Sequence, residues 1–81
     1  MAICSMIVKR KEEEKESVRA YLESLSGISV EQETPQGEFI ILVEAANLGA
    51  LHQIGQEIEQ AEGVLGLYPS YITTEDEETQ P

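Results

Sequence analysis

The chain has 81 residues, enough for one small domain with a single core, and 41% of them are hydrophobic. Its formal net charge is −11, and all five Lys and Arg residues lie between Lys9 and Arg19, so residues 20–81 carry twelve carboxylates and no cation. Such an anionic surface repels nucleic-acid backbones and anionic membranes and attracts cationic peptides, so we expect neither nucleic acid nor membrane as a partner.

The cysteine content and the first residues bear on the compartment. The single cysteine, Cys4, cannot form an internal disulfide. The apolar run Ala2–Val8 is too short for a signal peptide and has no positive charge before it, and no segment is long enough to span a bilayer. We therefore expect a cytoplasmic protein.

The first half of the chain predicts a strand, a helix and a second strand. The β-branched run Ala2–Val8 is typical of a strand near the middle of a sheet. From Glu12 to Leu25 the pattern predicts a helix with one buried stripe, because apolar residues recur at helical spacing: Val18, Tyr21, Leu22 and Leu25. Gly27 ends this helix, and Ile28–Glu33 alternates as a half-exposed strand does.

The second half begins with a hairpin and continues into a helix. Thr34–Gly37 has Pro and Gly where a type I turn favours them, which joins the preceding strand to Phe39–Val43. Asn47 is a predicted cap, and Gly55 lies on the buried stripe, where we expect it to permit close approach to a neighbouring element. The inward apolar residues of this helix are predicted to be Leu48, Leu51, Ile54, Ile58 and Ala61.

The end of the chain completes the topology. Gly63 ends the second helix, and Val64–Ile72 is predicted as an edge strand, because Pro69 cannot donate to a ladder. The order βαββαβ predicts an α+β, ferredoxin-like fold: a four-stranded antiparallel sheet with two helices on one face. We assign residues 1–73 to this domain and residues 74–81 to an acidic, disordered tail.

The sheet face without helices is the feature that suggests a function. Two strands supply apolar groups to both faces. In one of them we assign Phe39, Ile41 and Val43 to the core, because Ile40 and Leu42 share the other face with Glu38 and Glu44. In the other, the hydroxyl of Ser5 favours solvent. The predicted inward residues are Cys4, Met6 and Val8, and the predicted outward ones are Ile3, Ser5 and Ile7, with Tyr68 and Ser70 beside them.

An exposed apolar surface of this kind requires a cover, and two covers are considered. One is a second copy of the chain, stacked sheet on sheet in a homodimeric regulatory domain that senses a small molecule. The other is an apolar, cationic peptide. Fully burying four aliphatic side chains contributes roughly 1.5 to 3 kcal/mol each, and an arginine–carboxylate contact adds roughly 1.5 to 3 kcal/mol, so micromolar binding is within reach.

Catalytic and metal chemistry find little support in the sequence. Cys4 is expected in the core and His52 on the outer face of the second helix, so they do not form a nucleophile–base pair. One thiol cannot make a metal-transport site, and Ile40 and Leu42 stand where RNA-binding versions of the fold carry aromatic residues. Lys9–Lys11 has no Gly-rich phosphate cradle and is interpreted as a solvated turn. We expect no enzyme, metal or cofactor.

Several segments along the chain are informative when they are taken together: Cys4–Val8, the helix closed by Gly27, Gly37 before an aliphatic strand ending Val43–Ala45, Gly63–Leu65 and Tyr71. In this order and spacing they resemble the NapD family across nearly the whole chain outside the tail. The resemblance implies a cytoplasmic chaperone for the catalytic subunit of periplasmic nitrate reductase. It implies that this chaperone binds the twin-arginine signal peptide of that subunit on the sheet and holds back export until the molybdenum cofactor is inserted.

The resemblance also implies which residues touch the peptide. By position they are the outward residues Ile3, Ser5, Ile7, Ile40 and Leu42. Glu38 or Glu44 is the implied partner of an arginine. The chain departs from the family by its acidic load and by Pro69, which argues against backbone pairing of a peptide with that edge.

Overall fold

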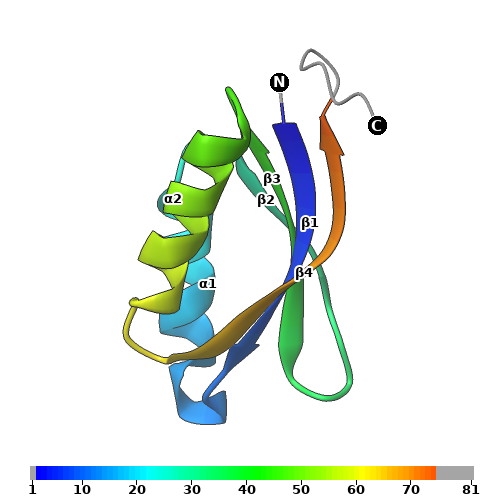
Figure 1. Cartoon of the computed structure of the whole chain (residues 1–81). Coiled ribbons are helices and arrows are strands. Elements are labelled where there is room, and N and C mark those ends of the chain that lie inside the picture. The colour runs from blue at the N-terminus through cyan, green and yellow to red at the C-terminus, as the bar shows by residue number, and fades with distance from the viewer. Residues whose placement is uncertain (1, 75–81) are drawn as a thin grey trace.

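The structure is a computed structural model, which describes the backbone of residues 2–74 and the side chains of residues 2–70. Its elements are β1 (Ala2–Arg10), the 3-10 helix η1 (Glu12–Glu14), α1 (Lys15–Ser24), β2 (Ile28–Glu33), β3 (Glu38–Ala45), α2 (Leu48–Glu59) and β4 (Val64–Thr74). The strands form one antiparallel sheet in the order β2-β3-β1-β4, with both helices on the same face (Figure 1). The predicted ferredoxin-like α+β fold is confirmed.

The core lies between this sheet and the two helices. Alternate residues of β1 and β3 point into it, and all of those predicted to do so are buried: Cys4, Met6, Val8, Phe39, Ile41 and Val43. The helices contribute Val18, Leu22, Leu51 and Ile58 to the same cluster. The assignment of the two sheet faces is therefore correct.

The end of β1 differs from its prediction. Arg10 belongs to the strand, and its side chain is only 1% exposed, so the interpretation of Lys9–Lys11 as a solvated turn is wrong. Its guanidinium donates to Glu12 Oε1 at 3.1 Å and Glu33 Oε2 at 2.9 Å and lies 4.8 Å from the centroid of the Phe39 ring. A buried cation is tolerated only when it is paired, and these contacts tie η1 and β2 to the end of β1.

The second helix begins as predicted but ends at Glu59, so Ala61, which is predicted on its buried stripe, lies past the helix end. Asn47 caps it, because Asn47 Oδ1 accepts a hydrogen bond from the Ala50 backbone N–H at 2.8 Å. Leu48 is 43% exposed, so its assignment to the buried stripe is wrong. As the first residue of α2 it lies at the margin of the helical layer, where neighbours cover it incompletely.

Both edge strands are irregular. In β4, Met6 pairs with Pro69 and Ser5 with Tyr71, which leaves Ser70 as an extra residue. In β2, Glu31 is the extra residue, between the pairs that Val30 and Gln32 make with β3. Pro69 thus occupies an edge, as predicted. β4 continues to Thr74, two residues past its expected end, and the rest of the predicted acidic tail, 75–81, lies outside the described residues.

Across residues 2–74 neither helix has the length and hydropathy that a membrane span needs.

Candidate functional site

The sheet face opposite the helices, here called the open face, carries the predicted contact residues as cross-strand neighbours. Ile7 of β1 pairs with Ile40 of β3 on one side and with Tyr68 of β4 on the other. Ser5 pairs with Leu42, and Ile3 with Glu44. Residues directly opposite one another in a ladder share a face, so the apolar side chains form one surface over the two central strands.

The side chains of this surface are less exposed than the sequence suggests. The side chains of Ile3, Ser5, Ile7, Ile40 and Leu42 are half-buried, because neighbouring strands cover their flanks. Tyr68 is 51% exposed. Within residues 2–74, both helices lie on the opposite side of the sheet and leave this face uncovered (Figure 1). The open face is thus apolar and accessible to a ligand. Each of its side chains offers less free area than a fully exposed side chain would.

One end of the open face is occupied by an ion pair that the sequence did not reveal. Lys9 Nζ lies 3.8 Å from Glu38 Oε2, and 5.7 Å from the centroid of the Tyr68 ring. The Thr34 hydroxyl donates to Glu38 Oε1 at 3.3 Å. Glu38, one of the two candidate partners for an arginine, already has a cation beside it.

The other end holds the second candidate, Glu44. Its side chain is exposed and lies opposite Ile3 in the ladder. Among the described residues no side chain forms an ion pair or a hydrogen bond with this carboxylate. Glu44 is therefore free to accept a charged hydrogen bond from a ligand.

The two β4 residues predicted beside the open face have structural contacts of their own. A Cβ at Gly66 would lie 2.7 Å from Tyr68 Oη, so the tyrosine ring lies across the glycine, toward Lys9. The Ser70 hydroxyl donates to the Ser5 carbonyl at 3.0 Å and braces the bulge. Gly66 is a residue whose importance the sequence did not indicate, because its lack of a side chain matters only through the ring of Tyr68, two residues further along the same strand.

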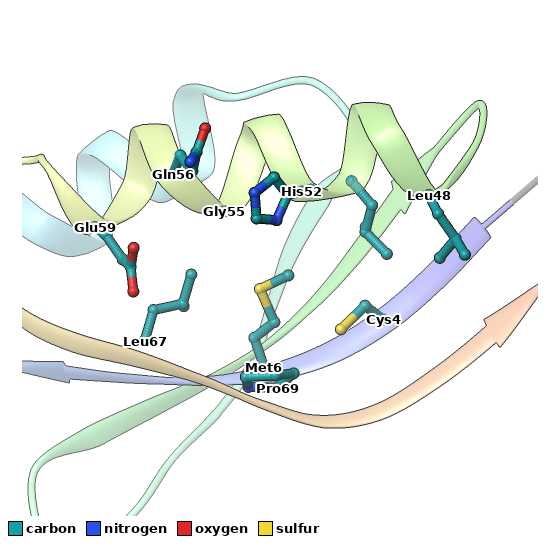
Figure 2. Close-up of a pocket in the computed structure, with 10 residues that line it drawn as sticks. Cys4, Met6, Leu48, His52, Gly55, Gln56, Glu59, Leu67 and Pro69 are labelled. Carbon is teal, nitrogen blue, oxygen red and sulfur yellow. The ribbon is translucent and has the colours of Figure 1, made fainter.

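A cavity of about 390 Å³ lies on the other side of the sheet, between α2 and the strands β1 and β4 (Figure 2). Its walls are mainly apolar, and three exposed polar side chains of α2 border it: His52, Gln56 and Glu59. Part of this space is due to the missing side chain of Gly55, since a Cβ there would stand 3.5 Å from Leu67 Cδ2, an ordinary contact distance. The expectation that Gly55 permits close approach is therefore wrong.

Cys4 and His52 both line this cavity, although the thiol is buried and the imidazole is exposed. The sequence placed His52 on the outer face of the helix, whereas it borders the cavity (Figure 2). Burial raises the pKa of the Cys4 thiol, whose Sγ lies 3.6 Å from the Ser5 carbonyl oxygen. A protonated thiol is a poor nucleophile. The described residues contain no group of three His, Cys, Asp or Glu side chains that could hold a metal.

Comparison with known proteins decides the family. Residues 1–76 match the family model described as NapD protein. The chain belongs to the NapD family. Chaperone NapD of Escherichia coli K12 is 29% identical over 76 residues, which cover 93% of this chain and 87% of that NapD, and Chaperone NapD of Shigella flexneri gives the same figures.

A solved structure agrees. The solution structure of the Escherichia coli Tat proofreading chaperone protein NapD matches with a TM-score of 0.79 at 28% sequence identity, covering 98% of this chain and 84% of that NapD. The family predicted from the resemblance is confirmed, and its named relatives are chaperones.

Proposed function

We propose that this NapD-family chain binds the twin-arginine signal peptide of the catalytic subunit of a periplasmic nitrate reductase on its open face. Bound in the cytoplasm, the peptide is withheld from export until the enzyme has received its cofactor. The function is one of binding, without catalysis. The observation that carries the proposal is an aliphatic sheet face that no other element of residues 2–74 covers, with a carboxylate beside it, Glu44, that has no ion-pair partner within the same residues.

The energetics favour a ligand that is both apolar and cationic. Ile3, Ile7, Ile40 and Leu42 are already partly buried, so covering them contributes at most roughly 1 kcal/mol each, about a third of the value for full burial. That total of roughly 4 kcal/mol is less than the roughly 8 kcal/mol that micromolar affinity needs, even before the cost of association. Arginine contacts to carboxylates, at roughly 1.5 to 3 kcal/mol each, must therefore supply an important share.

Isothermal titration calorimetry tests the proposal. The ligand is a synthetic peptide with two adjacent arginines followed by an apolar segment, and the control peptide has glutamines in place of the arginines. We expect binding at micromolar or lower concentration, and a loss of more than tenfold in affinity for the control. Absence of heat with the arginine peptide well above micromolar concentration would overturn the proposal.

Variants on the two faces of β3 locate the site. Ile40→Asp and Leu42→Asp should abolish binding and leave a folded protein, because both side chains are partly in contact with solvent. Ile41→Asp should unfold the chain, since Ile41 is 0% exposed and a carboxylate there is buried without a partner. The matched control is Leu48→Asp, an exposed leucine on the helical layer, which should bind normally.

The homodimer considered from the sequence would cover the same open face. Analytical ultracentrifugation of the free chain distinguishes the two occupants. A monomer that binds the peptide supports the chaperone proposal, whereas a stable dimer that Ile40→Asp dissociates, with no affinity for the peptide, supports the regulatory domain.

A further inference from the structure

This inference rests on the proposed function and concerns the direction of binding. We infer that the peptide lies along the open face in one orientation, with its arginines at the Glu44 end and its apolar segment over Ile7, Ile40 and Tyr68. The rest of the precursor then leaves the sheet at the Lys9 end, beside the turn Thr34–Gly37.

The charges at the two ends of the open face differ. At one end the carboxylate of Glu38 is matched by Lys9 at 3.8 Å and bonded by Thr34, so this end is close to neutral and its ammonium group repels an arginine. At the other end Glu44 has no cation beside it in the described part of the chain. Only this second end attracts an arginine pair.

The two ends act independently because of their separation. Along β1 the open face runs from Ile3 to Lys9, six residues apart, which at about 3.3 Å per residue is about 20 Å. The Debye length at physiological ionic strength is about 8 Å, so Lys9 does little to cancel the field of Glu44. The same 20 Å accommodates about six residues of an extended peptide or about 13 residues of a helix.

The apolar surface lies closer to the Lys9 end of the open face than to the Glu44 end. The most continuous apolar part is the row Ile40, Ile7 and Tyr68 across β3, β1 and β4, with Leu42 one ladder step away. Toward Glu44 this surface is interrupted by Ser5. A ligand whose cations precede its apolar segment can place the cations at Glu44 and the apolar segment over this row in only one direction.

Paramagnetic relaxation enhancement tests the direction. The full-length chain, labelled with nitrogen-15, is mixed with the arginine peptide carrying a nitroxide at its N-terminus or, in a second sample, at its C-terminus. The N-terminal label should broaden the amides of Ile3 and Glu44, and the C-terminal label those of Lys9 and Gly66. The reverse pattern, or equal broadening of both ends by each label, would overturn the inference while leaving the proposed function intact. Absence of binding would instead overturn the proposed function.

Matched charge variants provide an independent measurement. Glu44→Gln should weaken binding of the arginine peptide about tenfold and leave the affinity for the glutamine peptide unchanged. Glu38→Gln, the matched control, should change the affinity for the arginine peptide less than threefold. A larger coupling of the arginines to Glu38 than to Glu44 in this cycle contradicts the inferred direction.

Discussion

Gly55 illustrates how a single residue can leave a protein less stable than its fold allows. A Cβ at this position would make ordinary contacts, 3.5 Å from Leu67 Cδ2 and 3.8 Å from Met6 Cε, and would fill part of the cavity beside α2. Alanine is also favoured over glycine in a helix by about 1 kcal/mol. We expect Gly55→Ala to raise the free energy of unfolding by about 1 kcal/mol, measured by urea denaturation.

Gly63→Ala is the control for this substitution. Gly63 has φ +91°, and a Cβ there would stand 2.7 Å from Glu14 Cβ, so alanine should destabilise the chain. Equal effects of the two alanines would mean that neither the cavity nor the backbone of Gly63 decides the outcome.

Glu33 makes the stability of the chain dependent on pH. A hydrogen bond from Lys15, at 2.9 Å, and the nearby charges of Lys15 and Arg10 lower the pKa of Glu33. Because this pKa is lower in the folded than in the unfolded chain, the stabilisation is complete above the unfolded value of about 4.3 and is lost as the pH falls through the lowered value. In Glu33→Gln the urea midpoint should therefore decrease less between pH 6 and pH 3 than in the parent chain. An identical decrease in both would contradict this role for the Glu33 pKa.

At the scale of elements, the start of α2 depends on one side chain. Asn47 Oδ1 accepts the Ala50 N–H, which otherwise has no partner in the first turn of the helix. Replacing Asn47 by alanine should lower the free energy of unfolding by about 1 kcal/mol, whereas Asn47→Asp should preserve it, because aspartate caps equally well and favours the positive end of the helix dipole. Chemical denaturation followed by circular dichroism measures both, and an alanine variant as stable as the parent chain would show that the cap is dispensable.

The elements could be predicted because their signals are local. Alternation places Phe39, Ile41 and Val43 on one face, the hydroxyl of Ser5 identifies the other, and Asn47 marks a helix start. The end of β1 could not be predicted in this way. Lys9 and Arg10 have the polarity of a loop, and Arg10 is buried only because Glu33 and Phe39 come to it from other strands.

The candidate site was predicted in outline because the direction in which a strand residue faces is also a local signal. Which residues of β1 and β3 face outward follows from the period of two, but the state of each carboxylate depends on the register between strands. Lys9 reaches Glu38 because β1 and β3 place them opposite each other, and Glu44 meets Ile3 instead. The distinction between an occupied and a free carboxylate therefore required the structure.

At the scale of the whole molecule, salt should act in opposite directions on folding and on binding. The net charge of −11 repels itself within the folded chain, so raising the ionic strength from about 0.02 to about 0.5 M should increase the urea midpoint. The same change should weaken binding of the arginine peptide, since its attraction to carboxylates is screened. Denaturation and calorimetry in the same buffers check the pair of effects. A decrease of the urea midpoint with salt would show that ion pairs outweigh the net repulsion.

The two irregular edges of the sheet have a consequence for crowded conditions. An uninterrupted border strand offers a row of free N–H and C=O groups on which a second molecule can build a continuous ribbon. Here Pro69 and the extra Ser70 break that row on one border, and the extra Glu31 breaks it on the other. Lateral polymerisation is disfavoured at both borders, which protects the chain from fibril growth although its described helices cover only one side of the sheet.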